Sequence, residues 1–142
     1  MPEAAVELRS VSKEFVARDR RLVALQDIDL RIAPNEFAAI LGPSGCGKST
    51  LLNMVAGFDR PSAGRVLVNG TPVEAPHPSR AVVFQEAALF PWYTVWDNVS
   101  FGPRTMGIPA AHYRPKVEAY LEQVGLRGFE RHYPAELSGG MK

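Results

Sequence analysis

The sequence has few of the features that would tie a protein to a membrane, an oxidising compartment or a charged polymer. Its 142 residues include one cysteine, which excludes an internal disulfide. No apolar run approaches the ~18 residues of a membrane span, and no N-terminal stretch resembles a signal peptide. Basic residues number 16 and acidic residues 15, so bulk charge does not indicate nucleic acid or anionic lipid. We therefore expect a soluble, intracellular chain that reaches any membrane only through a partner.

One glycine-rich stretch fits the pattern G-x-x-x-x-G-K-[ST] of phosphate-binding loops. With the residue that follows it, it reads Gly42, Pro43, Ser44, Gly45, Cys46, Gly47, Lys48, Ser49, Thr50. Its glycines allow backbone angles that a side chain would block, so successive N–H groups can form an anion-binding nest. Lys48 supplies charge for the β- and γ-phosphates, and Ser49 supplies an oxygen for Mg²⁺. The stretch predicts a nucleotide site.

The flanking residues favour this interpretation over a glycine-rich turn with an incidental lysine. Residues 37–41 are a short apolar run, which predicts a strand buried on both faces. After the loop, apolar residues recur on one side of a predicted helix, and Gly57 marks its end. Cys46 lies at a position that the motif leaves free, which favours a small neutral filler over a redox centre.

Two-residue alternation dominates the N-terminal part. Over residues 6–32 apolar and charged residues alternate, which predicts half-exposed antiparallel strands joined through residues 18–21. Residues 65–68 predict another strand, and Asn69-Gly70 predicts a tight turn.

Two residues outside the loop are candidate site residues with open alternatives. A ring at Phe15 could stack on a nucleotide base, which typically stabilises by about 1–3 kcal/mol, whereas periodicity alone favours a core position. Residues 81–84 predict a second buried strand, and Gln85 follows at its carboxyl end, where ligands of open α/β sheets gather. From the residues alone, a site role for Gln85 and a generic strand-end hydrogen bond are equally supported.

The composition changes after residue 88. Aromatic and apolar residues crowd into residues 89–96, and helical patterns follow at 97–101 and 117–124, the second ending at Gly125. These patterns predict a small helical subdomain. We expect the aromatic cluster to be mostly core, with any exposed part forming a docking surface.

The last motif of the sequence is Leu137-Ser138-Gly139-Gly140. Ser138 is a good N-cap, and the two glycines would leave bare N–H groups at a helix start. The motif therefore predicts a second anion-binding site.

Taken together, these motifs resemble those of the ATP-binding subunits of ABC transporters over nearly the whole length. The resemblance rests on Phe15, the loop at 42–49, the segment 83–85 and the signature at 137–140. It implies an α/β fold: a P-loop NTPase core with an N-terminal antiparallel β subdomain and a helical subdomain, incomplete at the C-terminus. The β subdomain and P-loop core would occupy residues 1–88. The glutamine-loop exit and helical subdomain would occupy residues 89–142.

The resemblance also assigns residues to ATP. Phe15 would stack on adenine, where the family usually has tyrosine. The backbone of residues 42–47 would hold the phosphates with Lys48, and Ser49 would hold Mg²⁺. Thr50 would approach the α-phosphate.

Two further roles concern the γ-phosphate. Gln85 would sense it through Mg²⁺ or water. Ser138, Gly139 and Gly140 would bind the γ-phosphate of an ATP held by the opposite subunit, which requires a head-to-tail dimer.

Within the family, the sequence of residues 89–99 resembles that of the bacterial importers for nitrate, sulfonates and taurine. The implied cofactors are ATP and Mg²⁺. The implied partners are a second ATP-binding subunit, membrane permease subunits and, indirectly, a periplasmic solute-binding protein, with no nucleic acid. The expected location is cytoplasmic, peripheral on the inner face of the cell membrane.

The family's magnesium aspartate, glutamate base and switch histidine follow the signature and are not among these residues. His77, His112 and His132 all precede it. We therefore expect the sequence to be the N-terminal part of a longer subunit. Two other functions stay open: a soluble superfamily ATPase acting on ribosomes or damaged DNA, and a nucleotide-binding remnant without ATPase activity.

Overall fold

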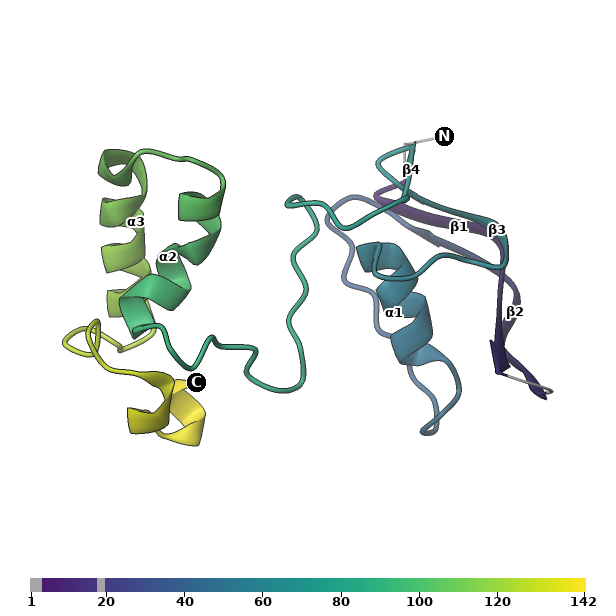
Figure 1. Cartoon of the computed structure of the whole chain (residues 1–142). Helices are drawn as coiled ribbons and strands as arrows, with labels where there is room; N and C mark the ends of the chain where they lie inside the picture. The colour runs from purple at the N-terminus through teal and green to yellow at the C-terminus, as the bar shows by residue number, and fades with distance from the viewer. Residues whose placement is uncertain (1–3, 18–19) are drawn as a thin grey trace. The chain divides into compact units, whose positions relative to one another are not determined.

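The chain folds into two compact units, a β-rich one over Met1–Val82 and a helical one over Val83–Lys142 (Figure 1). The computed structural model describes residues 4–17 and 20–142. Each unit has its own hydrophobic core. Within the described residues, none of the helices is both long and apolar enough to cross a bilayer.

The β-rich unit is built on a four-stranded antiparallel sheet in the order β2-β1-β3-β4. Its strands are β1 (Val6–Ala17), β2 (Arg20–Ile32), β3 (Ala63–Val68) and β4 (Thr71–Pro72). Val6 of β1 faces Ile32 on one side and Val68 on the other, which fixes the register of the three long strands. The antiparallel strands predicted within residues 6–32 are confirmed. Residues 18–19 of their predicted connection lie outside the described residues, and β2 already begins at Arg20.

The turn between β3 and β4 follows the sequence signal closely. The strand predicted at residues 65–68 is confirmed as part of β3. Asn69 and Gly70 both have positive φ, at 48° and 74°, as a two-residue hairpin turn requires.

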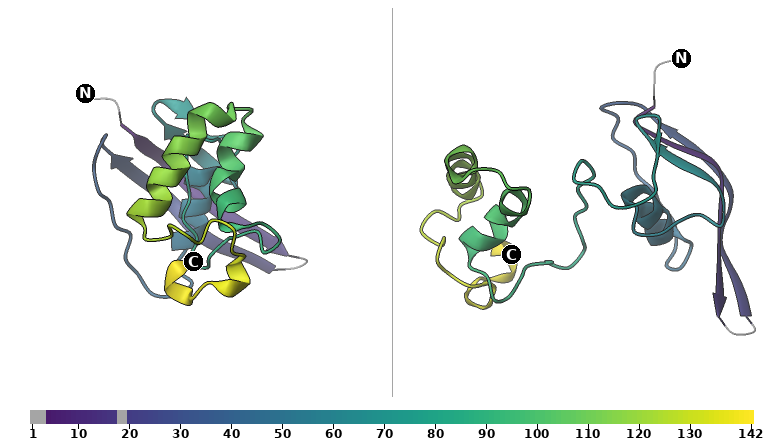
Figure 2. Two further views of the ribbon diagram at one scale, coloured as in Figure 1. Left: turned by 90° about the vertical axis from the view of Figure 1, so that its left-hand side faces the viewer. Right: turned by 45° about the horizontal axis from the view of Figure 1, so that its top comes forward.

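Helix α1 (Lys48–Ala56) lies against one face of this sheet (Figures 1 and 2). Leu51 and Met54 pack into the core formed by Leu8, Val11 and Val66. Met54 is 1% exposed, and burying a side chain of this size contributes about 1.5–3 kcal/mol.

The helix ends where the sequence predicts. Gly57 has a φ of 90°, and its N–H donates to the carbonyls of Asn53 and Met54. This left-handed cap satisfies carbonyls that the helix itself leaves without donors.

The two predicted buried strands are wrong. Residues 37–41 and 81–84 form no strand, and Phe37 and Val83 are each 94% exposed. In the part of the chain that the structure describes, no strand pairs with either segment. An apolar run shows what a strand could bury, but a strand buried on both faces also needs neighbouring strands and covering helices.

The helical unit consists mainly of α2 (Val95–Thr105) and α3 (Ala110–Gln123), followed by the short turns η1 (Pro134–Glu136) and η2 (Gly139–Met141). The two helices pack side by side (Figure 2). Both predicted helices are confirmed, and α2 is longer than residues 97–101. It begins two residues earlier because the Thr94 hydroxyl caps it, accepting the N–H of Asp97 at 3.1 Å.

The prediction of a mostly buried aromatic cluster holds only in part. Val95 is buried and Trp96 packs against the helical core, but Trp92 is 66% exposed and the remaining members are half-buried. The rings pack on one another at the surface, with the centroids of Phe90 and Phe101 4.6 Å apart. Two helices enclose too little volume to bury so many large side chains.

Replacing Gly57 by alanine should destabilise the protein. The added Cβ would collide with the backbone carbonyl of Ala75, and the residue would have to keep its positive φ. We expect the free energy of unfolding of the whole protein, from urea titrations followed by circular dichroism, to fall by at least about 1 kcal/mol.

Gly102→Ala is the matched control. Gly102 lies in α2 without a positive φ, and apart from its chain neighbours nothing lies within 4 Å of an added Cβ. The gain in helix propensity is offset by contact of the Cβ with the ring of Pro103, so alanine should change the free energy of unfolding by less than about 0.5 kcal/mol. Equal effects of the two substitutions would contradict the analysis of Gly57.

Candidate functional site

The phosphate loop, residues 42–47, leads directly into α1. It turns at Gly45 and Gly47, whose φ values are 81° and 95°. A Cβ at Gly47 would lie 2.7 Å from the carbonyl oxygen of Ala24 and 2.8 Å from Cδ2 of Leu25. Glycine is therefore required at position 47 both by the backbone and by the close approach of β2.

Lys48, the first residue of α1, reaches back over this loop. Its Nζ donates to the carbonyl oxygens of Gly42 at 2.7 Å and Pro43 at 2.6 Å, and lies 3.5 Å from Sγ of Cys46. The ammonium is thus held where a phosphate bound by the loop would meet it. In these bonds only the donor is charged, whereas a phosphate oxygen would bring an opposite charge, so phosphate oxygens can replace these carbonyls.

The first turn of α1 leaves its positive end open. The cap residue, Gly47, provides no side chain to bond the first N–H groups, and the first turn contains no acidic residue. Leu51 is the first residue whose N–H bonds back into the turn, to the carbonyl of Gly47 at 2.9 Å. The earlier N–H groups and the helix dipole therefore favour an anion beside Ser49 and Thr50.

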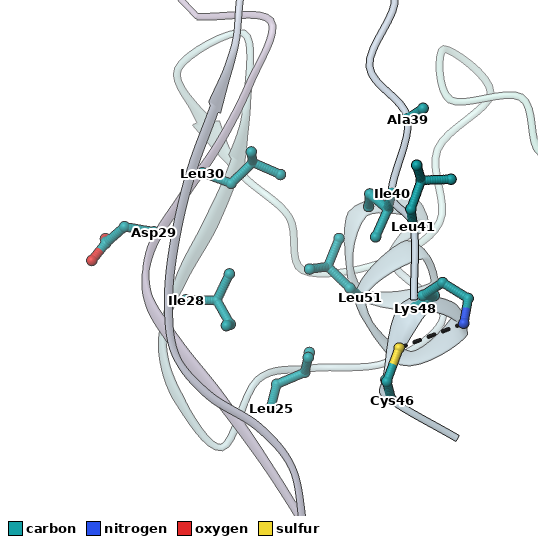
Figure 3. Close-up of a pocket in the computed structure, with 11 residues that line it drawn as sticks. Leu25, Ile28, Asp29, Leu30, Ala39, Ile40, Leu41, Cys46, Lys48 and Leu51 are labelled. Atoms are coloured by element: carbon teal, nitrogen blue, oxygen red, sulfur yellow. Dashed lines mark hydrogen bonds between the residues drawn. The ribbon is translucent and has the colours of Figure 1, made fainter. Parts of the chain in front are cut away.

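A cavity of about 410 Å³ adjoins the loop (Figure 3). Aliphatic side chains from β2, from residues 39–41 and from α1 line most of it, and Lys48 reaches it at one end. The Asp29 carboxylate points away from the cavity and accepts the N–H of Ser10 at 2.8 Å. Most of the cavity lining is apolar and offers no partner to a phosphate. The groups that can bind a triphosphate are therefore those of the loop and of the first turn of α1.

Phe15 lies near the end of β1 and is 40% exposed. The core position that periodicity favours is therefore wrong. Pairing of β1 with β3 stops at Ser12, so only β2 accompanies the strand at Phe15. The ring belongs to the same unit as the phosphate loop and is accessible to a flat ligand.

The other predicted site residues lie in the helical unit. Gln85 is exposed in an irregular segment. Residues 138–140 form an exposed turn, with Ser138 at the N-cap position of η2 but making no side-chain capping bond. Leu137 and Met141, on either side, pack into the helical core. The structure thus places Phe15 and residues 42–50 in one unit, and Gln85 and residues 138–140 in the other.

Sequence reasoning missed an ion pair next to Phe15. Nζ of Lys13 lies 2.5 Å from Oδ1 of Asp59, donates to the carbonyl of Arg60 at 2.8 Å, and stands 5.0 Å from the centroid of the Phe15 ring. The only local signal was a lysine two positions before an exposed aromatic. Its partner is 46 residues away, too far for any periodicity to reveal.

The family profile described as "ABC transporter" matches residues 25–142. The chain belongs to the ABC transporter family. It is 46% identical over 136 residues to a taurine import ATP-binding protein of Jannaschia sp., covering 95% of this chain and 51% of that one. It is 44% identical over 140 residues to a spermidine/putrescine import ATP-binding protein of Acidothermus cellulolyticus, covering 96% and 37%. An ABC transporter ATP-binding protein of Methanocaldococcus jannaschii is 44% identical over 137 residues, covering 96% and 51%. The chain thus spans about half the length of two of these ABC relatives and less of the third.

Solved structures confirm the fold class. An ATP-binding cassette described as a dimer in a post-hydrolysis state, bound to ADP and phosphate, superposes with a TM-score of 0.80 at 28% identity, covering 96% of this chain and 64% of that one. A dimeric bacterial ABC transporter cassette gives a TM-score of 0.79 at the same identity and coverage. The antiparallel sheet, phosphate loop and helical unit are therefore parts of an ABC ATPase fold.

Acid should weaken the contact between β1 and the segment after α1. The hydrogen bond from Lys13 holds the pKa of Asp59 below its usual value, although partial burial opposes this. A carboxyl group with a lower pKa when folded stabilises the protein above its unfolded pKa, and this contribution is lost as pH falls through the folded pKa. We expect Asp59→Asn to reduce the loss of stability between pH 5 and pH 3, measured by urea unfolding.

Lys13→Met is the companion variant, because it removes the partner that lowers the pKa. It should reduce the acid dependence in the same way. An acid dependence identical in all three proteins would show that the pair contributes nothing.

Proposed function

We propose that the protein is the ATP-binding and ATP-hydrolysing subunit of a membrane importer. The observation that carries this proposal is the position of the Lys48 ammonium, held over a glycine loop at the open N-terminus of α1. A nest of N–H groups, one mobile cation and an adjacent hydroxyl are the groups that a nucleoside triphosphate with Mg²⁺ requires.

In this proposal the two ends of ATP bind to different parts of the β-rich unit. Adenine stacks on Phe15, residues 42–47 and Lys48 hold the β- and γ-phosphates, and Thr50 approaches the α-phosphate. The exposure of Phe15 and of the loop supports this arrangement.

Ser49 is the proposed ligand for Mg²⁺ in the β-rich unit, and Gln85 is proposed separately as a polar ligand in the helical unit. Ser49 is exposed on the first turn of α1, beside Lys48. Within the described residues there is no group of three or more His, Cys, Asp or Glu side chains that could hold a metal. The donor set fits Mg²⁺ bound to a nucleotide, which relies on few protein ligands together with phosphate oxygens and water.

The turn at Ser138, Gly139 and Gly140 would contact the ATP of a second copy. Its exposure between the buried Leu137 and the partly buried Met141 supports this role, because both neighbours anchor the turn to the helical core. The two cassettes of similar structure are described as dimeric, which supports a pair of subunits; the head-to-tail arrangement is part of the proposal. In such a pair ATP stabilises the interface, and hydrolysis weakens it.

The proposed partners are a second copy of the subunit, a membrane permease and, indirectly, a periplasmic solute-binding protein, at the cytoplasmic face of the membrane. Relatives named for taurine import and for spermidine/putrescine import support import as the direction of transport. Their identities of 46% and 44% are too close to separate the solutes. We favour nitrate, sulfonate or taurine because of the sequence at residues 89–99.

Lys48→Met should weaken ATP binding by the whole protein about 10- to 100-fold, because a charge-assisted contact to phosphate is lost. Equilibrium titration with a fluorescent ATP analogue measures this. Lys116→Met is the control: it removes the same charge at an exposed position of α3 that is not assigned to ATP, and it should change affinity less than about threefold. Unchanged affinity in Lys48→Met would refute the proposed site.

Residues 1–142 alone should hydrolyse ATP negligibly and tend to aggregate. None of the residues that the structure describes is assigned to activate water, and Phe37, Leu41 and Val83 are 94%, 90% and 94% exposed. Phosphate release and thermal melting of this piece, compared with those of the whole protein, test the expectation. Ordinary turnover with cooperative melting would contradict it.

A further inference from the structure

The segment that follows α1 is fastened to β1 just before Phe15. Lys13 contacts Asp59 and Arg60, as described above. The N–H of Ser62 donates to the carbonyl of Ser12 at 2.8 Å, and the Ser62 hydroxyl accepts the N–H of Glu14 at 3.0 Å. Each of the three residues preceding Phe15 is therefore bonded to residues 58–62.

The other end of this segment is fastened to α1. The N–H groups of Phe58 and Asp59 both donate to the carbonyl of Asn53, at 2.9 Å and 3.3 Å. Since α1 begins at Lys48, a continuous bonded path leads from the phosphate loop along the helix to Asp59. From there the ion pair leads to Lys13 and to the aromatic ring.

Lys13 also contacts the ring itself. The Lys13 side chain is 12% exposed, so its ammonium is enclosed between Asp59 and Phe15. A cation near a ring face is attracted by the ring, and the attraction strengthens as water is excluded. The lysine thus limits where the ring can lie, while the ring remains 40% exposed to a ligand.

We propose that Lys13 is a positioning residue for nucleotide binding: its ion pair with Asp59 fixes Phe15 relative to the phosphate loop, so that the base and the triphosphate of one ATP bind together. This inference rests on the proposed function, because it assumes that Phe15 stacks on adenine. The physical reason is that two contacts made by one ligand reinforce each other only when their spacing is set in advance.

The ion pair between Lys13 and Asp59 could instead serve only to stabilise the fold. Its loss would then weaken the binding of every ligand of the phosphate loop alike. A positioning residue affects only ligands that carry a base, and only through Phe15. Comparing ATP with inorganic tripolyphosphate separates the two cases.

The test uses the whole protein and its Lys13→Met variant, at a temperature where circular dichroism shows both to be folded. Dissociation constants for ATP and for tripolyphosphate come from isothermal titration calorimetry. We expect Lys13→Met to weaken ATP about two- to fivefold, the range expected for a cation–ring contact, and to leave tripolyphosphate unchanged. Lys13→Arg should restore ATP binding, because arginine can keep both the ion pair and the ring contact.

A second comparison tests the route through the ring. In a Phe15→Ala background, adding Lys13→Met should not weaken ATP binding further. Asp59→Asn supplies an independent variant if Lys13→Met does not fold, and it should weaken ATP but not tripolyphosphate.

The inference is overturned if Lys13→Met weakens both ligands equally, if it weakens neither, or if it still weakens ATP binding without Phe15. If the unmodified protein nevertheless binds ATP more tightly than tripolyphosphate, the inference fails but the proposed function does not. If the unmodified protein shows no such preference, or if Phe15→Ala does not reduce it, the adenine contact of the proposed function fails as well.

Discussion

The packing of α1 against the antiparallel sheet is the interaction on which the rest of the structure depends. Leu51 and Met54 fix the helix against β1 and β3, and Gly47 lets β2 approach the helix start. With the helix held in this way, its N-terminus presents the phosphate loop and its C-terminus presents the segment that contacts β1. Apolar packing that has no role in chemistry thus sets the positions of the groups that do.

The helical unit uses the same principle on a smaller scale. Leu137 and Met141 are held in its core, and the three residues between them form an exposed turn. The two glycines have open space around them, so the turn offers backbone N–H groups without side chains in the way. The buried Leu137 and the partly buried Met141 keep this exposed turn in place.

Much of this architecture follows from local patterns in the sequence. Alternation predicts β1 and β2, Asn69-Gly70 predicts the β3–β4 turn, and the glycine loop predicts the start of α1. Such patterns depend on neighbours a few residues apart, and so does the local backbone. The family comparison then places these elements in an ABC ATPase fold.

The predictions that failed concern partners distant in sequence. Residues 37–41 and 81–84 are apolar enough for buried strands, but whether a strand forms depends on which other strands lie beside it. The ion pair between Lys13 and Asp59 was missed for the same reason. Burial of the aromatic cluster was overestimated because side-chain type does not reveal how much volume two helices can enclose.

The contacts of Lys48 within its own loop have a consequence for which anions the loop retains. Its ammonium already has the carbonyl oxygens of Gly42 and Pro43 as acceptors, so a ligand must displace satisfied bonds instead of filling a vacancy. An anion with a single phosphate offers few oxygens to compensate for that exchange, whereas a chain of three can reach the lysine and the helix terminus simultaneously. If the loop binds phosphate as proposed, these bonds would favour long polyphosphates over orthophosphate.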